Sequence, residues 1–151
     1  MSNSAWKDLT PSQVNRCAKD EVERKFVSQG WRVSPAERPH AFTVLTPNGG
    51  RFNVVVRSFR VEKKTSYTFM RKTAFNPDPS LLLAVVRFEE GQAPSLYLIP
   101  SSVDGQPNPL LENRPYTERH KSTPEWGITL SESKMAVIRN ECTFSDTMAR
   151  L

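Results

Sequence analysis

An almost uninterrupted run of apolar residues constrains the fold of this chain more than any other feature. The run is Leu-Leu-Leu-Ala-Val-Val-Arg-Phe at residues 81–88, and only Arg87 breaks it. It has the length of a β-strand, and it lacks the alternation that is typical of a strand with one solvated face. We therefore expect a central strand that is covered on both faces. This predicts an α/β fold with a central mixed β-sheet flanked by helices.

A second strong signal is the β-hairpin predicted over residues 41–60. The segments 41–45 and 51–60 have strand composition, and Asn48-Gly49 between them suits a tight turn that needs positive φ angles. Alternation along the second segment divides its side chains between two faces. Phe52, Val54 and Val56 are expected on one face, and Asn53, Val55 and Arg57 on the other.

The opening helix has clear start and stop signals. Thr10-Pro11-Ser12-Gln13 combines an N-cap threonine, a proline at the first helical position and a glutamine that can close a capping box. Gly30 is the expected C-terminal stop. A spacing of four residues gives the helix one apolar stripe, which consists of Val14, Ala18, Val22 and Phe26.

The remaining elements are less strongly signalled. Residues 31–33 predict a short strand, residues 65–70 a strand that extends the meander, and residues 95–99 a further strand. Five prolines between residues 100 and 127 predict a long irregular loop. A last helix is expected over residues 132–140 after the N-cap Ser131, with Met135 and Ile138 facing inward.

The chain has 151 residues, which is the size of one domain. We expect a flexible N-terminal tail at residues 1–9, a single domain at residues 10–144 and a C-terminal tail at residues 145–151. No segment is apolar enough to cross a membrane, and the polar first residues do not resemble a signal peptide, so we expect a cytoplasmic protein. The two cysteines, Cys17 and Cys142, are expected to be reduced and structural.

The positive charge is concentrated in one short segment. The whole chain carries a formal charge of +5, but residues 51–72 alone contain seven Lys or Arg residues against the single acid Glu62. Such a segment is the electrostatic signature of a polyanion-binding surface.

Several segments together carry a resemblance to a known superfamily. They are Ala18-Lys19, Val22, Phe26 and Gly30-Trp31 in the opening helix, Phe42-Thr-Val44 and Phe52-Asn-Val-Val-Val-Arg57 in the hairpin, and Leu82–Val86 and Leu96–Pro100 in the later strands. In this order they resemble the restriction-endonuclease-like, or PD-(D/E)XK, nucleases. The resemblance covers about residues 12–100 and implies a restriction-endonuclease-like core.

The catalytic acids of that superfamily are missing from the matching positions. Lys19 stands where the opening helix would carry a glutamate, and Phe42 or Thr43 where the hairpin would carry the metal-binding aspartate. Val55 and Arg57 stand at the acid-x-Lys pair. Since these nucleases hold Mg²⁺ through carboxylates, the resemblance implies a degenerate nuclease that binds without cleaving. We therefore expect no metal site and no cofactor.

An alternative is that acids elsewhere rebuild a site. In that case the chain is an active, Mg²⁺-dependent endonuclease with Glu21, Glu62 and Arg57 as its catalytic residues. Other acids that could contribute are Glu23, Asp78 and Glu89-Glu90.

The basic segment also contains aromatic residues. Cations bind phosphates, and aromatic rings can stack on unpaired bases. Alternatively, Phe59, Tyr67 and Phe69 point into the core and leave an ordinary solvated basic face. The predicted nucleic-acid-binding residues are Arg57, Arg60, Lys63, Lys64, Arg71, Lys72, Lys19 and Tyr67.

Two further features bear on function. The only histidines, His40 and His120, lie far apart without a companion ligand, so zinc is not expected. The segment 114–127 contains Tyr116 and Trp126, which either anchor the loop or contact a protein partner or a second copy. The function expected from the sequence is non-catalytic DNA or RNA binding, and the alternative is a protein-interaction module that acts as an inhibitor or an assembly factor. No membrane partner is expected.

Overall fold

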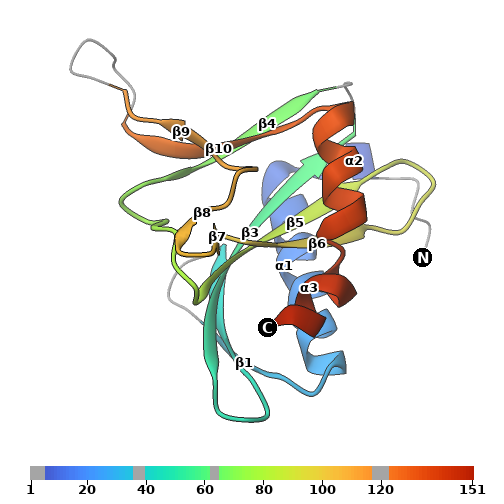
Figure 1. Cartoon of the computed structure of the whole chain (residues 1–151). Coiled ribbons are helices and arrows are strands. Elements are labelled where there is room, and N and C mark those ends of the chain that lie inside the picture. Colours follow the sequence, from blue (N-terminus) through green and yellow to red (C-terminus); the bar gives the residue numbers. More distant parts are fainter. Residues whose placement is uncertain (1–5, 36–39, 62–64, 117–122) are drawn as a thin grey trace.

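The computed structural model describes residues 6–35, 40–61, 65–116 and 123–151, whose arrangement is shown in Figure 1. The helical elements are the 3₁₀ turn η1 (Trp6–Asp8), α1 (Pro11–Ser28), α2 (Glu132–Glu141) and α3 (Phe144–Arg150). The strands are β1 (Arg32–Pro35), β2 (Ala41–Leu45), β3 (Arg51–Arg60), β4 (Ser66–Arg71), β5 (Leu81–Phe88), β6 (Ser95–Pro100), β7 (Ser102–Val103), β8 (Gln106–Pro107), β9 (Glu112–Arg114) and β10 (Glu125–Leu130).

The central sheet is mixed, with the strand order β1-β2-β3-β5-β6. The strands β1, β2 and β3 form an antiparallel meander, β3 and β5 run parallel, and β6 runs antiparallel to β5. Every residue of β5 is buried except the half-buried Arg87. The prediction of a central strand covered on both faces is therefore confirmed, as is the α/β fold with a mixed sheet and flanking helices.

The β2–β3 hairpin pairs the two predicted segments, but in its turn only Gly49, and not Asn48, has a positive φ. Leu45 pairs with Arg51 and Ala41 with Val55, and Gly49 in the turn has a φ of +88°. The structure has two hydrophobic cores: the first contains Phe26 and Phe42, and the second contains Met70 and Ile128. The predicted alternation in β3 is also present, because Val54 and Val56 are buried in the first core while Val55 packs against the second. The β3 side chains that point away from the first core therefore face the second core.

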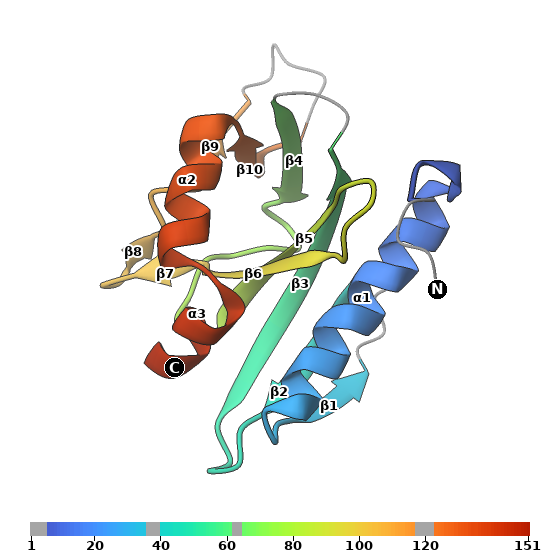
Figure 2. The ribbon, with the colours of Figure 1, turned by 90° about the vertical axis from the view of Figure 1, so that its right-hand side faces the viewer.

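Helix α1 begins and ends as predicted. Thr10 Oγ1 accepts a hydrogen bond from the Gln13 backbone N–H at 3.2 Å, and Gln13 Oε1 accepts one from the Thr10 N–H at 2.8 Å. Gly30 follows the helix with a φ of +83°. Figure 2 shows α1 along the β1–β3 side of the central sheet and α2 and α3 beside β6. The predicted stripe is buried in the first core, at Val14, Ala18, Val22 and Phe26.

A second, smaller sheet covers the other face together with α2. Its strand order is β4-β10-β9, and Figure 1 shows it as a separate layer. Ile128 and Leu130 of β10 and Met135 and Ile138 of α2 are buried in the second core, against β5 and β6. The helix predicted after Ser131, with these two α2 residues facing inward, is thus confirmed.

The segment predicted to extend the meander forms a strand, β4, in a different place. Strand β3 already has β2 and β5 as neighbours, so it offers β4 no open edge. Strand β4 pairs instead with β10, from Ser66 opposite Leu130 to Arg71 opposite Glu125. In the described part of the chain, the connection from β3 to β5 contains β4 and a turn, and no helix.

The stretch predicted as a long irregular loop is more ordered than its prolines indicated. Between residues 100 and 127 lie the β7–β8 pair, β9 and the start of β10. The buried Leu110 and Leu111 attach this stretch to the second core. Pro107 takes part in strand pairing, so the prolines shorten the strands of this region without preventing them.

The two ends of the described chain also differ from the expected tails. Trp6 is 6% exposed and belongs to the first core, where its ring centroid lies 4.8 Å from that of Phe88. Residues 144–150 form α3, which is capped by Thr143 and buries Phe144 and Thr147. In both cases one aromatic side chain reaches the first core and holds its segment there. No helix in the described residues is long and apolar enough to cross a membrane.

Candidate functional site

The main depression near the predicted site residues runs along β3, between the β2–β3 hairpin on one side and β4 and the segment that follows it on the other. It consists of three hollows of about 470, 190 and 410 Å³. The first two share Ala41 and Val55, and the last two share Arg57, so the three form one continuous surface. We call it the β3–β4 groove. Its polar lining residues are His40, Thr43, Asn53, Arg57, Tyr67, Thr68, Arg71, Thr73, Asn76 and Asp78.

Arg57 lies at the centre of the groove and connects the two sheets. Its Nε donates to the Phe69 carbonyl of β4 at 3.1 Å, and its Nη1 donates to the Val56 carbonyl at 3.0 Å. No carboxylate pairs with it within the described residues. Burial lowers the pKa of the guanidinium from its usual value. The pKa of an arginine nevertheless lies so far above neutral pH that the side chain stays charged. Among the described residues, the hydrogen-bond acceptors of this half-buried positive charge are main-chain carbonyls.

Two more of the predicted nucleic-acid-binding residues line the groove with Arg57. Arg71 is exposed at the end of β4, and its side chain makes no hydrogen bond or ion pair with any residue that the structure describes. Tyr67 is also on β4, and its hydroxyl donates to Glu125 Oε2 at 2.6 Å. This hydrogen bond and burial raise the pKa of Tyr67, burial contributing most.

The other predicted binding residues have different roles or lie elsewhere. Arg60 donates to the carbonyls of Trp6 and Leu9, and so ties the N-terminal segment to β3. The Lys72 ammonium donates to Asn113 and lies 4.8 Å from the centroid of the Trp126 ring. Lys63 and Lys64 lie outside the described residues, as does Glu62.

Lys19 is placed on α1 and takes part in the electrostatics of the groove. Its ammonium pairs with Glu23 at 3.7 Å. His40 lines the groove immediately before β2, and its pKa is lowered from the usual value by partial burial and then by the positive charges of Arg57 and Lys19. Lys19, His40 and Arg57 therefore belong to one electropositive neighbourhood.

The positions matched to catalytic acids surround the groove without supplying carboxylates. Thr43 and Val55 line its first hollow, and Thr43 Oγ1 donates to Asn53 Oδ1 at 3.1 Å. Asp78 is the carboxylate in this lining, and its Oδ1 accepts both the Ser80 N–H and the Ser80 hydroxyl at 2.6 Å.

Three of the acids considered for a rebuilt site, Glu21, Glu23 and Glu89, form ion pairs with basic residues. Glu21 pairs with Arg24 on α1, and Glu89 pairs with Arg87 next to β5. Within the residues that the structure describes, no three His, Cys, Asp or Glu side chains are close enough together to hold a metal ion.

Several groove residues and one structural glycine were not predicted from the sequence. Asn53 was assigned to the correct face, but its contact with Thr43 depends on strand register. Gly127 lies in β10, where a Cβ atom would be 1.9 Å from the Tyr67 hydroxyl oxygen. A lone glycine between Trp126 and Ile128 is a recognisable signal that another group approaches the strand backbone closely. The signal was not used because this region was predicted to be a loop.

Packing within the protein accounts for part of the segment 114–127, which was expected to anchor the loop or to contact a partner. Trp126 is half-buried and packs against the second core, so it anchors β10. Tyr116 precedes the undescribed residues 117–122, which include His120. Comparisons of the chain with protein-family models, with curated proteins and with solved structures found no match.

The lowered pKa of His40 allows a test of ligand placement. We expect His40 to titrate below its usual value of about 6.5 in the free protein, and to titrate at higher pH if nucleic acid, the partner expected from the sequence, fills the groove, because phosphate charge would offset Arg57 and Lys19. The measurement is a histidine NMR titration with and without a saturating oligonucleotide, assigned with His120→Gln. An unchanged His40 titration at saturation would place the nucleic acid elsewhere.

Proposed function

We propose that this protein binds nucleic acid in the β3–β4 groove and does not cleave it. The observation that carries the proposal is the pair of arginines in the groove. Arg57 contacts only main-chain carbonyls, and Arg71 has no polar partner in the described chain. Two guanidinium groups without carboxylate partners are suited to phosphate, because they can form charge-assisted hydrogen bonds without first breaking an ion pair.

The proposal that the protein does not cut its ligand depends on the donor groups in the groove. A nuclease of the superfamily that the sequence resembles needs carboxylate oxygens to hold Mg²⁺. The matching positions instead carry Thr43, Val55 and Arg57, and Asp78 is already engaged by Ser80. We also propose that the core is a degenerate member of that superfamily, which the β2–β3 hairpin and the parallel β3–β5 pair support.

Removing the charge of Arg71 tests the proposed function. We expect Arg71→Ala to weaken binding of a labelled oligonucleotide about tenfold at low salt and to reduce the salt slope by about one, as for the loss of one phosphate contact. The side chain is exposed and without a polar partner in the described chain, so the variant should fold normally. Fluorescence anisotropy over a series of salt concentrations gives both quantities.

The matched control is Arg139→Ala, which removes the same charge from an exposed position on α2 outside the groove. We expect it to bind like the wild type. If both variants weakened oligonucleotide binding equally, the effect would be one of general charge, and this would contradict the proposal that nucleic acid binds in the groove. Incubation with Mg²⁺ or Mn²⁺ in the same assay should leave the oligonucleotide intact, whereas metal-dependent cutting would favour the endonuclease alternative.

A further inference from the structure

The outer face of the small sheet carries two exposed aromatic rings beside the groove. Tyr67 and Phe69 are 42% and 43% exposed, whereas Phe59 packs against the second core. Their ring planes differ by only 20°, and their centroids are 6.5 Å apart. The two rings are separated by one residue on β4, so they lie on the same face of the strand. They form a small, partly exposed aromatic surface, and the guanidinium of Arg114 lies over its Tyr67 ring.

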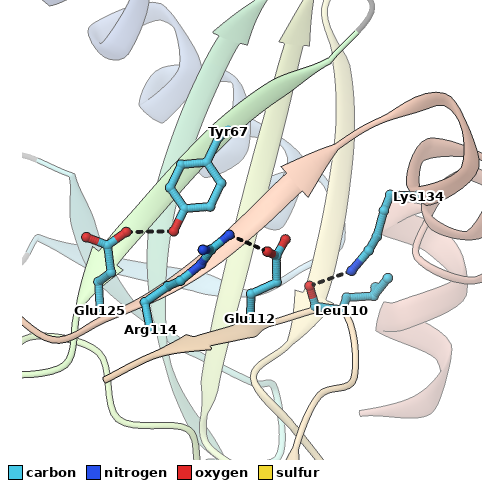
Figure 3. Close-up of polar contacts among 6 residues, drawn as sticks. All are labelled: Tyr67, Leu110, Glu112, Arg114, Glu125 and Lys134. Carbon is cyan, nitrogen blue, oxygen red and sulfur yellow. Dashed lines mark hydrogen bonds and ion pairs between the residues drawn. The ribbon is translucent and has the colours of Figure 1, made fainter. Parts of the chain in front are cut away.

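This surface is held in position by its neighbours on β10 and β9. The Tyr67 hydroxyl is anchored to Glu125, whose side chain is buried, and the guanidinium of Arg114 lies 5.5 Å from the Tyr67 ring centroid. Figure 3 shows Tyr67 directed toward Glu125, with Arg114 between Tyr67 and Glu112. Gly127 leaves the space that the end of the tyrosine ring occupies. The ring is therefore fixed before any ligand binds, and this lowers the entropic cost of binding.

The charges next to the rings indicate which ligand would cover them. Phe69 is followed two residues later by Arg71, and its carbonyl is the acceptor for Arg57. Aromatic rings and guanidinium groups that lack carboxylate partners suit a polyanion that also has flat π faces. Nucleic acid has this composition, whereas an apolar protein surface would leave both positive charges unmatched.

The rings further distinguish single strands from duplexes. In a duplex the faces of the bases are stacked on one another and only their edges are accessible. An exposed side-chain ring can stack only on a base that has left the helix or was never paired. We propose that this protein selects single-stranded nucleic acid, with unpaired bases stacked on Tyr67 and Phe69 and the adjacent phosphates on Arg57 and Arg71. This inference rests on the proposed nucleic-acid binding in the β3–β4 groove.

The test compares single strands and duplexes of the same length. The probes are a labelled oligothymidylate of about 15 nucleotides, within the range of single-strand site sizes, and the same strand paired with oligoadenylate. Wild-type protein should prefer the single strand. Phe69→Ala should weaken single-strand binding about 5-fold to 150-fold, the range for loss of one stacked base. It should leave duplex binding nearly unchanged, because it removes no charge.

Two more variants distinguish an effect of the aromatic rings on binding from an effect on folding. Gly127→Ala keeps every charge and both aromatic residues but forces the Tyr67 ring to move, so it should also weaken single-strand binding selectively. Val137→Ala truncates an exposed apolar side chain on α2 and is the matched control, expected to bind like the wild type. Circular dichroism and thermal unfolding confirm that each variant is folded.

The possible outcomes distinguish the two proposals. Equal affinity for both probes, with no effect of Phe69→Ala, would overturn the single-strand inference and leave phosphate binding in the groove intact. Binding of neither probe would overturn both. Self-association of the wild type that Phe69→Ala abolishes, measured by light scattering without nucleic acid, would assign the rings to a second copy and also overturn the inference.

Discussion

Replacing Phe26 with alanine is expected to lower the free energy of unfolding by about 3 to 5 kcal/mol, the range for truncating a buried phenylalanine. The ring is fully buried, and its centroid lies 4.9 Å from that of Phe144, 5.5 Å from Trp31 and 6.1 Å from Phe42. It therefore joins α1 to α3 and to the central sheet. No single neighbour can move to fill the cavity without leaving its own contacts. The loss is a large fraction of the roughly 5 to 15 kcal/mol that is typical of a domain.

Urea denaturation followed by circular dichroism measures this change. The matched control is Val27→Ala at the next position of the same helix, where the side chain is 57% exposed. We expect the control to change stability by no more than about 0.5 kcal/mol. If Phe26→Ala had an effect as small as that of the control, Phe26 could not be the common contact of α1, α3 and the sheet.

Trp6→Ala is the second substitution with a large expected effect. Its Nε1–H donates to the Gln92 carbonyl at 3.1 Å, and its ring packs against Phe88. Arg60 adds hydrogen bonds to the carbonyls of Trp6 and Leu9. Loss of the buried ring should reduce the free energy of unfolding by about 3 to 5 kcal/mol. A side chain in a flexible tail would instead contribute almost nothing.

Two neighbouring variants resolve the contributions of Trp6 in the same denaturation assay. Trp6→Phe retains a ring against Phe88 but removes the indole hydrogen bond, so it should cost about 1 kcal/mol, because water can replace the indole at the carbonyl of the exposed Gln92. Asp8→Ala changes an exposed residue of the same turn and should be close to neutral. A Trp6→Ala protein with wild-type stability would restore the expectation of a flexible tail at residues 1–9.

Much of the fold was predictable because its signals are local. The capping box of α1 and the turn around Gly49 depend on residues within a few positions of each other. The apolar run 81–88 showed directly that its strand is buried on both faces. The candidate site was less predictable. Arg57, Arg71 and Tyr67 were identified and do line the groove, but Arg60 serves to hold the N-terminal segment and Lys72 contacts Asn113 and Trp126.

The remaining features depend on contacts between distant parts of the chain. Alternation in 66–71 divides the side chains into two faces, but it does not show which face a second layer covers, so the exposure of Tyr67 and Phe69 could not be decided. The position of β4 depended on the absence of an open edge on β3. The burial of Trp6 depended on its contact with Phe88, which lies far away in the sequence.

The sequence by itself determined helix α1, the β2–β3 hairpin, the central strand β5 and helix α2, and the absence of carboxylates from the positions that match the metal ligands of the nucleases it resembles. Those properties reside in residue identity and short-range spacing. Only the tertiary structure decided that Arg57 reaches across to the Phe69 carbonyl, and that Arg71 and parts of two aromatic rings are exposed beside it. The physical reason is that exposure and charge pairing depend on which strand edges and layers meet, and residues far apart in the chain determine that contact.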